Sequence, residues 1–250
     1  MIRLALALAS LALVAGCGDE EDKAVGGETT TGTAQTADLR VYFLREAEVW
    51  PVRRQIETTG GEGTAAIAAL LQGPTAQEKA DLDLSTAIPE TDEDVEVTIE
   101  DGVAEVQLDV QLSQPGLAQV VYTLSQLPGV ERIEVQERFL TRADFEEQTP
   151  AILVESPLAY EDVASPLQVT GTANTFEANF EYELTDTDGK IVDESFVTAT
   201  SGTGTRGTFD FTTDAFTVPF DGVGALIVFE RSAEDGSRMN LVEIPLRMTR

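Results

Sequence analysis

The stretch VEVTIEDGVAEVQL, residues 95–108, decides the fold of the first half of this chain. Within it, Asp101-Gly102 is a two-residue turn of the type that closes β-hairpins. A hairpin closed there pairs two short strands in a register that brings apolar residues together on one face. The predicted pairs are Ile99 with Ala104, Val97 with Val106 and Val95 with Leu108.

Two more strands and two helical segments are predicted before this hairpin. Alternating apolar residues predict strands over 38–44 and 49–57. Thr64 is expected to cap a helix that Gly73-Pro74 ends, and the capping-box pattern at 75–78 opens a second helical turn. In the first strand, the alternating apolar side chains are Leu39, Val41 and Phe43.

After the hairpin, a helix is predicted over 115–127 and a strand over 130–136. The helix carries one apolar stripe at helical spacing. This order of elements predicts an α+β domain over 38–137, an antiparallel sheet with helices packed on it. The residues of the stripe are Leu117, Val120, Val121, Leu124 and Leu127.

The second half, residues 151–250, has no helical stripe and many short alternating runs. Turn residues separate these runs, as at Asp188-Gly189 and Asp235-Gly236. About seven short strands in a hundred residues are typical of an all-β immunoglobulin-like sandwich. Charged residues 138–150 are the expected linker. Two of the runs are Phe176, Ala178, Phe180, Tyr182 and Leu184, and Phe216, Val218 and Phe220.

Residues 38–136 resemble the GerMN domain of sporulation and spore-germination proteins. That resemblance leads us to expect an Asp-Gly turn after the last strand, where this chain has Gln136-Glu137, so a final hairpin is left open. The fragments that carry the resemblance are VYFL at 41–44, PVRRQI at 51–56, ALLQGPT at 69–75, TAIPE at 86–90, DGVAEVQLD at 101–109 and GVERIEV at 129–135.

Residues 151–247 resemble the immunoglobulin-like domain of bacterial spore germination. The two resemblances together imply an envelope-associated, non-catalytic protein with cell-wall or protein ligands, and they do not imply that the organism makes spores. The matching fragments are VESP at 154–157, SPLQVTGTA at 165–173, FEANFEYEL at 176–184 and VFERSAEDGS at 228–237.

The first residues predict export. Arg3 is followed by an apolar run that is too short to span a bilayer but has the length of a signal-peptide core. The run ends in Val-Ala-Gly-Cys, which resembles the lipobox of bacterial lipoproteins and implies that Cys17 is acylated. We therefore expect a signal peptide over 1–16 and a lipidated flexible tether over 17–37, rich in acidic residues, Gly and Thr. The expected location is the extracytoplasmic face of the cell membrane.

Composition excludes several classes of function. A net charge of −29 argues against nucleic acid as a partner, because phosphate binding needs clustered cations. The chain has no histidine and its one cysteine is Cys17, which removes Ser-His-Asp and Cys-His catalysis and His-ligated zinc. We therefore expect no enzyme activity and no cofactor, and we assign no metal ligands, while a non-EF-hand calcium site between acidic loops such as 90–94 stays open. A pair of catalytic carboxylates is the third-ranked functional hypothesis.

Trp50, Arg53 and Arg54 are the candidate ligand-binding residues. Two arginines beside a tryptophan can hold a carboxylate or a sugar. The competing interpretation is that Trp50 packs in the first domain while the arginines pair with surface acids, and we favour it. The leading functional hypothesis is a lipid-anchored scaffold that binds peptidoglycan or other envelope proteins. The alternative is an accessory subunit of a membrane sensor or transport complex.

Overall fold

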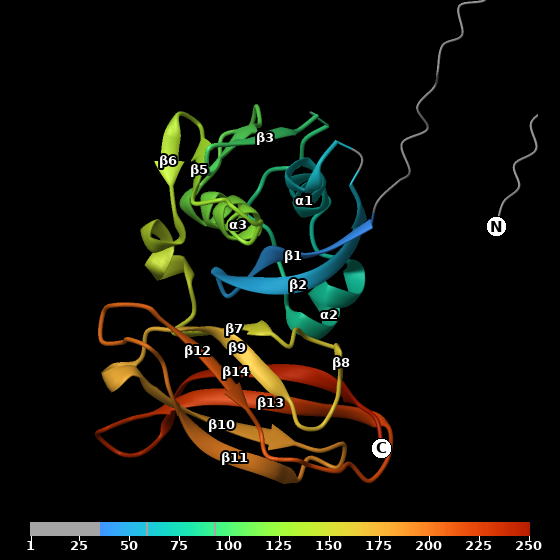
Figure 1. Cartoon of the computed structure of the whole chain (residues 1–250), viewed down its shortest axis with the longest axis vertical. Coiled ribbons are helices and arrows are strands. Elements are labelled where there is room, and N and C mark those ends of the chain that lie inside the picture. The colour runs from blue at the N-terminus through green and yellow to red at the C-terminus, as the bar shows by residue number, and fades with distance from the viewer. Residues whose placement is uncertain (1–35, 59, 93) are drawn as a thin grey trace, which may run out of the picture. The chain divides into compact units, whose positions relative to one another are not determined.

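The computed structural model describes residues 36–58, 60–92 and 94–250 (Figure 1). Cys17 and almost all of the expected tether lie outside these residues. The described chain is mostly β, and its α-helices belong to the first half. In that half the elements are β1 (Thr36–Arg45), β2 (Glu48–Glu57), α1 (Glu62–Leu71), α2 (Ala76–Leu82), β3 (Glu96–Glu100), β4 (Val103–Gln107), α3 (Gln114–Leu124), β5 (Arg132–Val135), β6 (Arg138–Leu140) and the 3-10 helix η1 (Arg142–Gln148).

The predicted hairpin is present as β3 and β4. Ile99 pairs with Ala104 and Val97 with Val106, as predicted, whereas Val95 lies just before the paired strands. Burial is unequal across the pair: Ala104 and Val106 are buried, but Ile99 is 41% exposed. The reason is the strand order β3-β4-β5-β6, in which β3 is an edge and β4 is interior.

The turn of this hairpin depends on left-handed backbone at Gly102, where φ is +80°. A valine there is expected to lower the free energy of unfolding by about 1–2 kcal/mol, because β-branched residues are strained in that conformation. An added Cβ would meet only the flexible side chain of Glu131, so the effect is one of backbone strain. Urea denaturation measures it. Thr98→Val adds the same side chain in β3 and serves as the control that should leave stability unchanged.

The first helix begins earlier than predicted. Its N-cap is Gly61, and the expected cap, Thr64, lies inside α1. The Thr64 hydroxyl instead accepts a hydrogen bond from the Val97 backbone N–H at 3.0 Å, which joins α1 to β3. The capping box of α2 is confirmed: Thr75 and Glu78 exchange side-chain to backbone hydrogen bonds. The predicted stripe of the third helix is entirely buried in α3 and the turn that follows it.

The β1–β2 ribbon is a separate two-stranded sheet rather than part of one sheet. In β1 the residues Val41, Tyr42, Phe43 and Leu44 are all buried, so burial does not alternate as the sequence analysis expected. The backbone of Tyr42 bonds to Thr123 and Gln119 of α3, while its hydroxyl donates to a Glu155 carboxylate oxygen. The ribbon is therefore covered by helices and also by the start of the second half.

Residues 138–150, expected as a linker, are ordered structure. They contain β6 and η1, and Phe145 of η1 is fully buried. β5 and β6 form a hairpin whose two turn residues, Gln136 and Glu137, both have positive φ. This is the final hairpin that the sequence left open, built without the expected Asp-Gly turn.

The second half contains two β-sheets, with strand orders β11-β10-β13-β14-β8 and β12-β9-β7. Aromatic pairs join their inner faces: Phe180 lies 4.9 Å from Phe209, and Tyr182 lies 4.5 Å from Phe211, between ring centroids. The strands are β7 (Ile152–Ser156), β8 (Asp162–Val163), β9 (Gln168–Ala173), β10 (Asn179–Thr185), β11 (Ile191–Thr198), β12 (Gly207–Thr212), β13 (Gly222–Arg231) and β14 (Arg238–Met248).

One strand prediction in this half was wrong at its start, and another was wrong throughout. The run beginning at Phe176 is not strand until Asn179, because Phe176–Ala178 form a 3-10 turn, η2, in which Glu177 and Ala178 have positive φ. Residues 216–220 form no strand, although Val218 is buried. Pro219 in that run lacks the N–H that a sheet ladder needs.

Candidate functional site

The three candidate residues on β2 do not share one face. Side chains alternate along a strand, so Trp50 and Arg54 point to one side and Arg53 to the other. Trp50 is 7% exposed, and the Arg45 guanidinium lies 4.8 Å from its ring centroid. It lines a small hollow of about 100 Å³ that Arg53 does not reach. Trp50 therefore packs in the core and is not available as a broad ligand platform.

Arg54 is held by Glu78 of α2. Two guanidinium nitrogens donate to the two carboxylate oxygens of Glu78, at 2.5 and 2.6 Å. Burial alone would raise the pKa of Glu78, but hydrogen bonds from Arg54 and Thr75 outweigh it and hold that pKa below its usual value. The pair fixes α2 against β2, and Arg54 also lies over the Phe43 ring at 5.4 Å.

Arg53 is the candidate that faces an open site. Its side chain is about half exposed and donates to the carboxylates of Glu161 and Asp38. The hydrogen bond to Glu161 is the main cause of the raised pKa of Arg53. Because the Arg53 side chain stays about half exposed, its guanidinium can exchange these partners for a ligand.

Arg53 lines a cleft of about 680 Å³. The lining comes from β2, from α2 and its N-cap Thr75, from residues 159–162 at the start of β8, and from Arg247 of β14. Most of it is polar. Besides Arg53, the polar side chains that line the cleft are Gln55, Thr75, Gln77, Glu78, Tyr160, Glu161, Asp162 and Arg247.

Tyr160 provides the aromatic ring that lines this cleft. Its backbone has φ +62°, an uncommon value for a bulky residue, and its N–H donates to the Pro245 carbonyl at 2.7 Å. Arg247 donates to the Tyr160 carbonyl, and its guanidinium lies 5.7 Å from the Tyr160 ring. The cleft thus combines two guanidiniums, amides, carboxylates and one ring, a set suited to binding a polar ligand.

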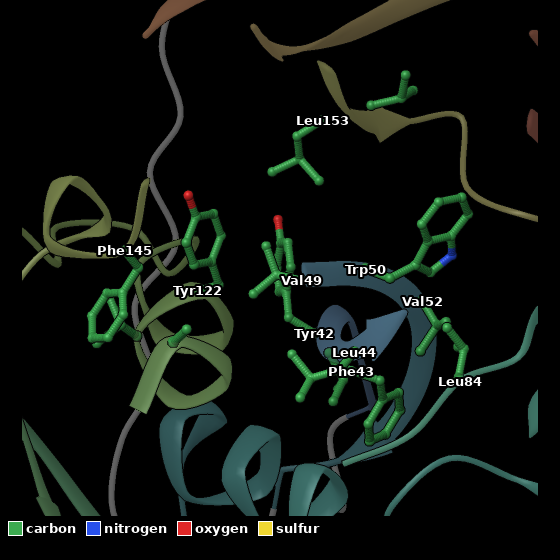
Figure 2. Close-up of a cluster of buried hydrophobic side chains, with 14 of the residues drawn as sticks. Tyr42, Phe43, Leu44, Val49, Trp50, Val52, Leu84, Tyr122, Phe145 and Leu153 are labelled. Atoms are coloured by element: carbon green, nitrogen blue, oxygen red, sulfur yellow. The ribbon is translucent and has the colours of Figure 1, made fainter. Parts of the chain in front are cut away.

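A partly buried ionic network lies at the junction of the two halves. Arg142 of η1 donates to Glu155 of β7 at 2.8 Å and to the Ser125 hydroxyl at 2.6 Å. The Tyr42 hydroxyl donates to the same carboxylate, and Figure 2 shows Tyr42 beside Tyr122, whose ring centroid lies 5.3 Å away. Burial and the Glu155 charge raise the pKa of Tyr42 well above its usual value, so it stays a protonated donor.

No metal site is found among residues 36–58, 60–92 and 94–250: they contain no group of three or more acidic side chains able to hold an ion. Nor does that part of the chain contain a helix long and apolar enough to cross a membrane.

The comparisons with known proteins divide the chain in the same way as its two halves. Residues 40–137 match the family described as "Sporulation and spore germination". Residues 151–237 match the family described as "Immunoglobulin-like domain of bacterial spore germination". The chain therefore carries two domains that each match a spore-germination domain family. No curated protein matches it significantly.

Two solved structures show limited similarity to this domain pair. The tandem GerMN domains of the sporulation protein GerM from Bacillus subtilis are 27% identical, with 42% of this chain and 41% of that chain covered and a TM-score of 0.32. CopC from Methylosinus trichosporium OB3b is 17% identical, with 39% and 93% covered and a TM-score of 0.26. The chain spans less than half of the GerM structure that it matches.

Sequence reasoning missed the cleft residues outside β2. Alternation along the strand would have separated Arg53 from Trp50 and Arg54, which is a signal present in the sequence. Tyr160, Glu161 and Arg247 give no comparable signal, because only the tertiary fold brings the β7–β8 segment and β14 to β2.

Proposed function

We propose that this protein is a non-catalytic envelope lipoprotein, anchored through acylated Cys17 on the extracytoplasmic face of the membrane, that binds a cell-wall fragment in the cleft beside Arg53. The observation that carries the proposal is the polar cleft, because its lining is contributed by both spore-germination domains. Binding sites are commonly found where domains meet. The lipobox-like sequence and the two family matches support the envelope location.

The chemistry of the cleft favours peptidoglycan over an apolar ligand. Peptidoglycan offers acetamido and hydroxyl groups on its sugars and carboxylates on its peptides. The amides Gln55 and Gln77 suit the former, and the guanidiniums of Arg53 and Arg247 suit the latter. The Tyr160 ring offers an apolar surface on which a sugar face can stack.

The anchor is tested by replacing Cys17. We expect the wild-type protein to incorporate labelled palmitate and to sediment with membranes. Cys17→Ala should incorporate none and should lose its membrane attachment, because nothing else in the proposal holds the protein there. Equal labelling, or equal sedimentation of the processed Cys17→Ala protein, would contradict a lipid anchor.

Wall binding is tested by retention on purified peptidoglycan. The double variant Arg53→Gln, Gln77→Ala is expected to weaken retention about tenfold, since charged hydrogen bonds contribute about 1.5–3 kcal/mol each. The matched control is Arg231→Gln, which removes an exposed, ion-paired arginine far along the chain. Unchanged retention of the double variant would exclude the cleft as the wall site. Co-purification with membrane proteins and no wall retention would favour the accessory-subunit alternative.

A further inference from the structure

A second groove, independent of the cleft, lies on the second domain beside two exposed phenylalanines. Phe176 is 65% exposed and Phe196 is 74% exposed, and both line a groove of about 340 Å³. Large exposed aromatic side chains grouped at a hollow are a feature of interaction surfaces. The remaining lining is mostly charged: Glu177, Glu181, Glu230 and Arg231, with Asn179 and Phe180.

Phe176 is held in its exposed position by an ordered and strained turn. The next two residues, Glu177 and Ala178, both have positive φ, which is uncommon for residues other than glycine. The loop that begins at Gly202 packs on this turn so closely that a Cβ on Gly202 would lie 2.5 Å from the Ala178 nitrogen. The Thr203 hydroxyl also accepts from the Glu177 N–H at 3.0 Å. The ring is therefore presented by a fixed backbone.

The groove carries an excess of negative charge. Three of its side chains are carboxylates, those of Glu177, Glu181 and Glu230, against one guanidinium, that of Arg231. Arg231 is already paired with Glu181. Glu230 is buried and accepts from the Phe176 N–H at 2.9 Å and from the Asn240 amide, and it forms no ion pair with any cation of the described chain. The exposed Glu177 carboxylate also forms no ion pair within the described residues, so a cationic partner would meet a carboxylate that is not neutralised, beside aromatic rings.

The groove also adjoins a free strand edge. β11 has β10 as its only sheet neighbour among the described strands, and Figure 1 shows it at the margin of its sheet. Phe196 faces the same side as Glu181, its partner in β10, and Glu194 lies two residues away on that side. An edge strand offers unpaired backbone groups to a strand from another chain.

We propose that this groove and the β11 edge bind an extended segment of another protein, one that places an apolar and a cationic side chain two residues apart. The segment adds to β11 as an extra strand. Its apolar side chain then packs on Phe196 and Phe176, and its lysine or arginine meets Glu194 or Glu177.

Charge argues against two other occupants of the groove. A second copy of this chain also has a net charge of −29, so two copies would repel each other across an acidic surface. The chain's own segment before Thr36 is acidic as well, with GDEED at 18–22.

The test is a titration of the full-length protein with a labelled peptide of repeated phenylalanine-threonine-lysine-threonine, followed by fluorescence anisotropy. This peptide places phenylalanine and lysine on one face of a strand. Phe196→Ser is expected to weaken binding at least about tenfold, as for a central aromatic contact. Glu194→Gln is expected to weaken it about threefold, as for one exposed charge pair.

Matched controls separate this surface from non-specific binding. Phe139→Ser removes a phenylalanine that is 59% exposed in β6, in the other domain, and should leave the affinity unchanged. Arg53→Gln should also leave the peptide affinity unchanged. The result for peptide binding at the groove is therefore independent of the result for cell-wall binding at the cleft. The proposal is overturned if the wild type does not bind the peptide. It is also overturned if a peptide with glutamate in place of lysine, or proline in place of threonine, binds equally well. A dimer of this protein that Phe196→Ser dissociates would likewise overturn it.

Discussion

Replacing Glu155 with alanine is expected to lower the free energy of unfolding by about 3 kcal/mol, because the change leaves Arg142 charged and without its partner in a mostly buried place. The two side chains are only 12% and 26% exposed, and the Tyr42 hydroxyl loses its acceptor as well. Glu155→Gln keeps an acceptor for Tyr42 and should show about half the loss. Urea denaturation followed by the fluorescence of Trp50, the only tryptophan of the chain, measures both variants.

An exposed ion pair provides the comparison. Glu181 and Arg231 are 36% and 48% exposed, so Glu181→Ala should change stability by less than about 1 kcal/mol. If Glu155→Ala were as mild as Glu181→Ala, the junction network would contribute little to holding the halves together.

The same network gives stability a definite dependence on pH. Burial alone would raise the pKa of Glu155, but the charge of Arg142 and the hydrogen bond from Tyr42 outweigh it and hold that pKa below its usual value. A carboxyl with a depressed pKa in the folded state stabilises the fold above its unfolded pKa, about 4.3. That contribution disappears as the pH falls through the folded pKa. The stability difference between wild type and Glu155→Gln should therefore be full at pH 7 and shrink below about pH 4.3.

Gly171→Ala in β9 is expected to destabilise the second domain by about 3 kcal/mol or more, because overpacking against backbone has little room to relax. An added Cβ would lie 2.1 Å from the Leu153 carbonyl oxygen and 2.6 Å from the Phe209 ring. Gly171 pairs with Val154 on one side and Phe209 on the other, so both flanking strands would have to move. Thermal unfolding followed by circular dichroism measures the loss.

Gly189→Ala is the matched control for this substitution. Gly189 has φ +77° with nothing within 4 Å of an added Cβ, so only left-handed strain of about 1–2 kcal/mol applies. Equal effects of the two changes would show that steric contact at Gly171 is not decisive.

Local sequence predicted those elements whose geometry is local. The Asp101-Gly102 turn fixes the register of its hairpin, and the capping box fixes the start of α2. The burial of Tyr42 could not be predicted, since its second covering comes from β7, more than a hundred residues later. Residues 138–150 misled for a related reason. Their charged composition suggested a linker, whereas the fully buried Phe145 anchors them.

The candidate site, like the fold, could be predicted only where its contacts are local in sequence. Arg54 pairs with Glu78, and Arg53 pairs with Asp38 and Glu161, as the competing interpretation expected of both arginines. That Arg53 also lines a large cleft depends on contacts between segments far apart in sequence. The groove beside Phe176 was not predicted, because the alternating pattern assigned Phe176 to the inward face of a strand. Its exposure follows from the positive φ of the next two residues.

The double covering of the β1–β2 ribbon limits how these two domains can be exchanged among proteins. A gene fusion that transferred the first domain alone would leave the hydroxyl end of Tyr42 and the guanidinium of Arg142 facing water or an unsuited neighbour. Recombination is therefore expected to move the pair as one inherited block, unless the recipient supplies its own acidic residue where Glu155 stands.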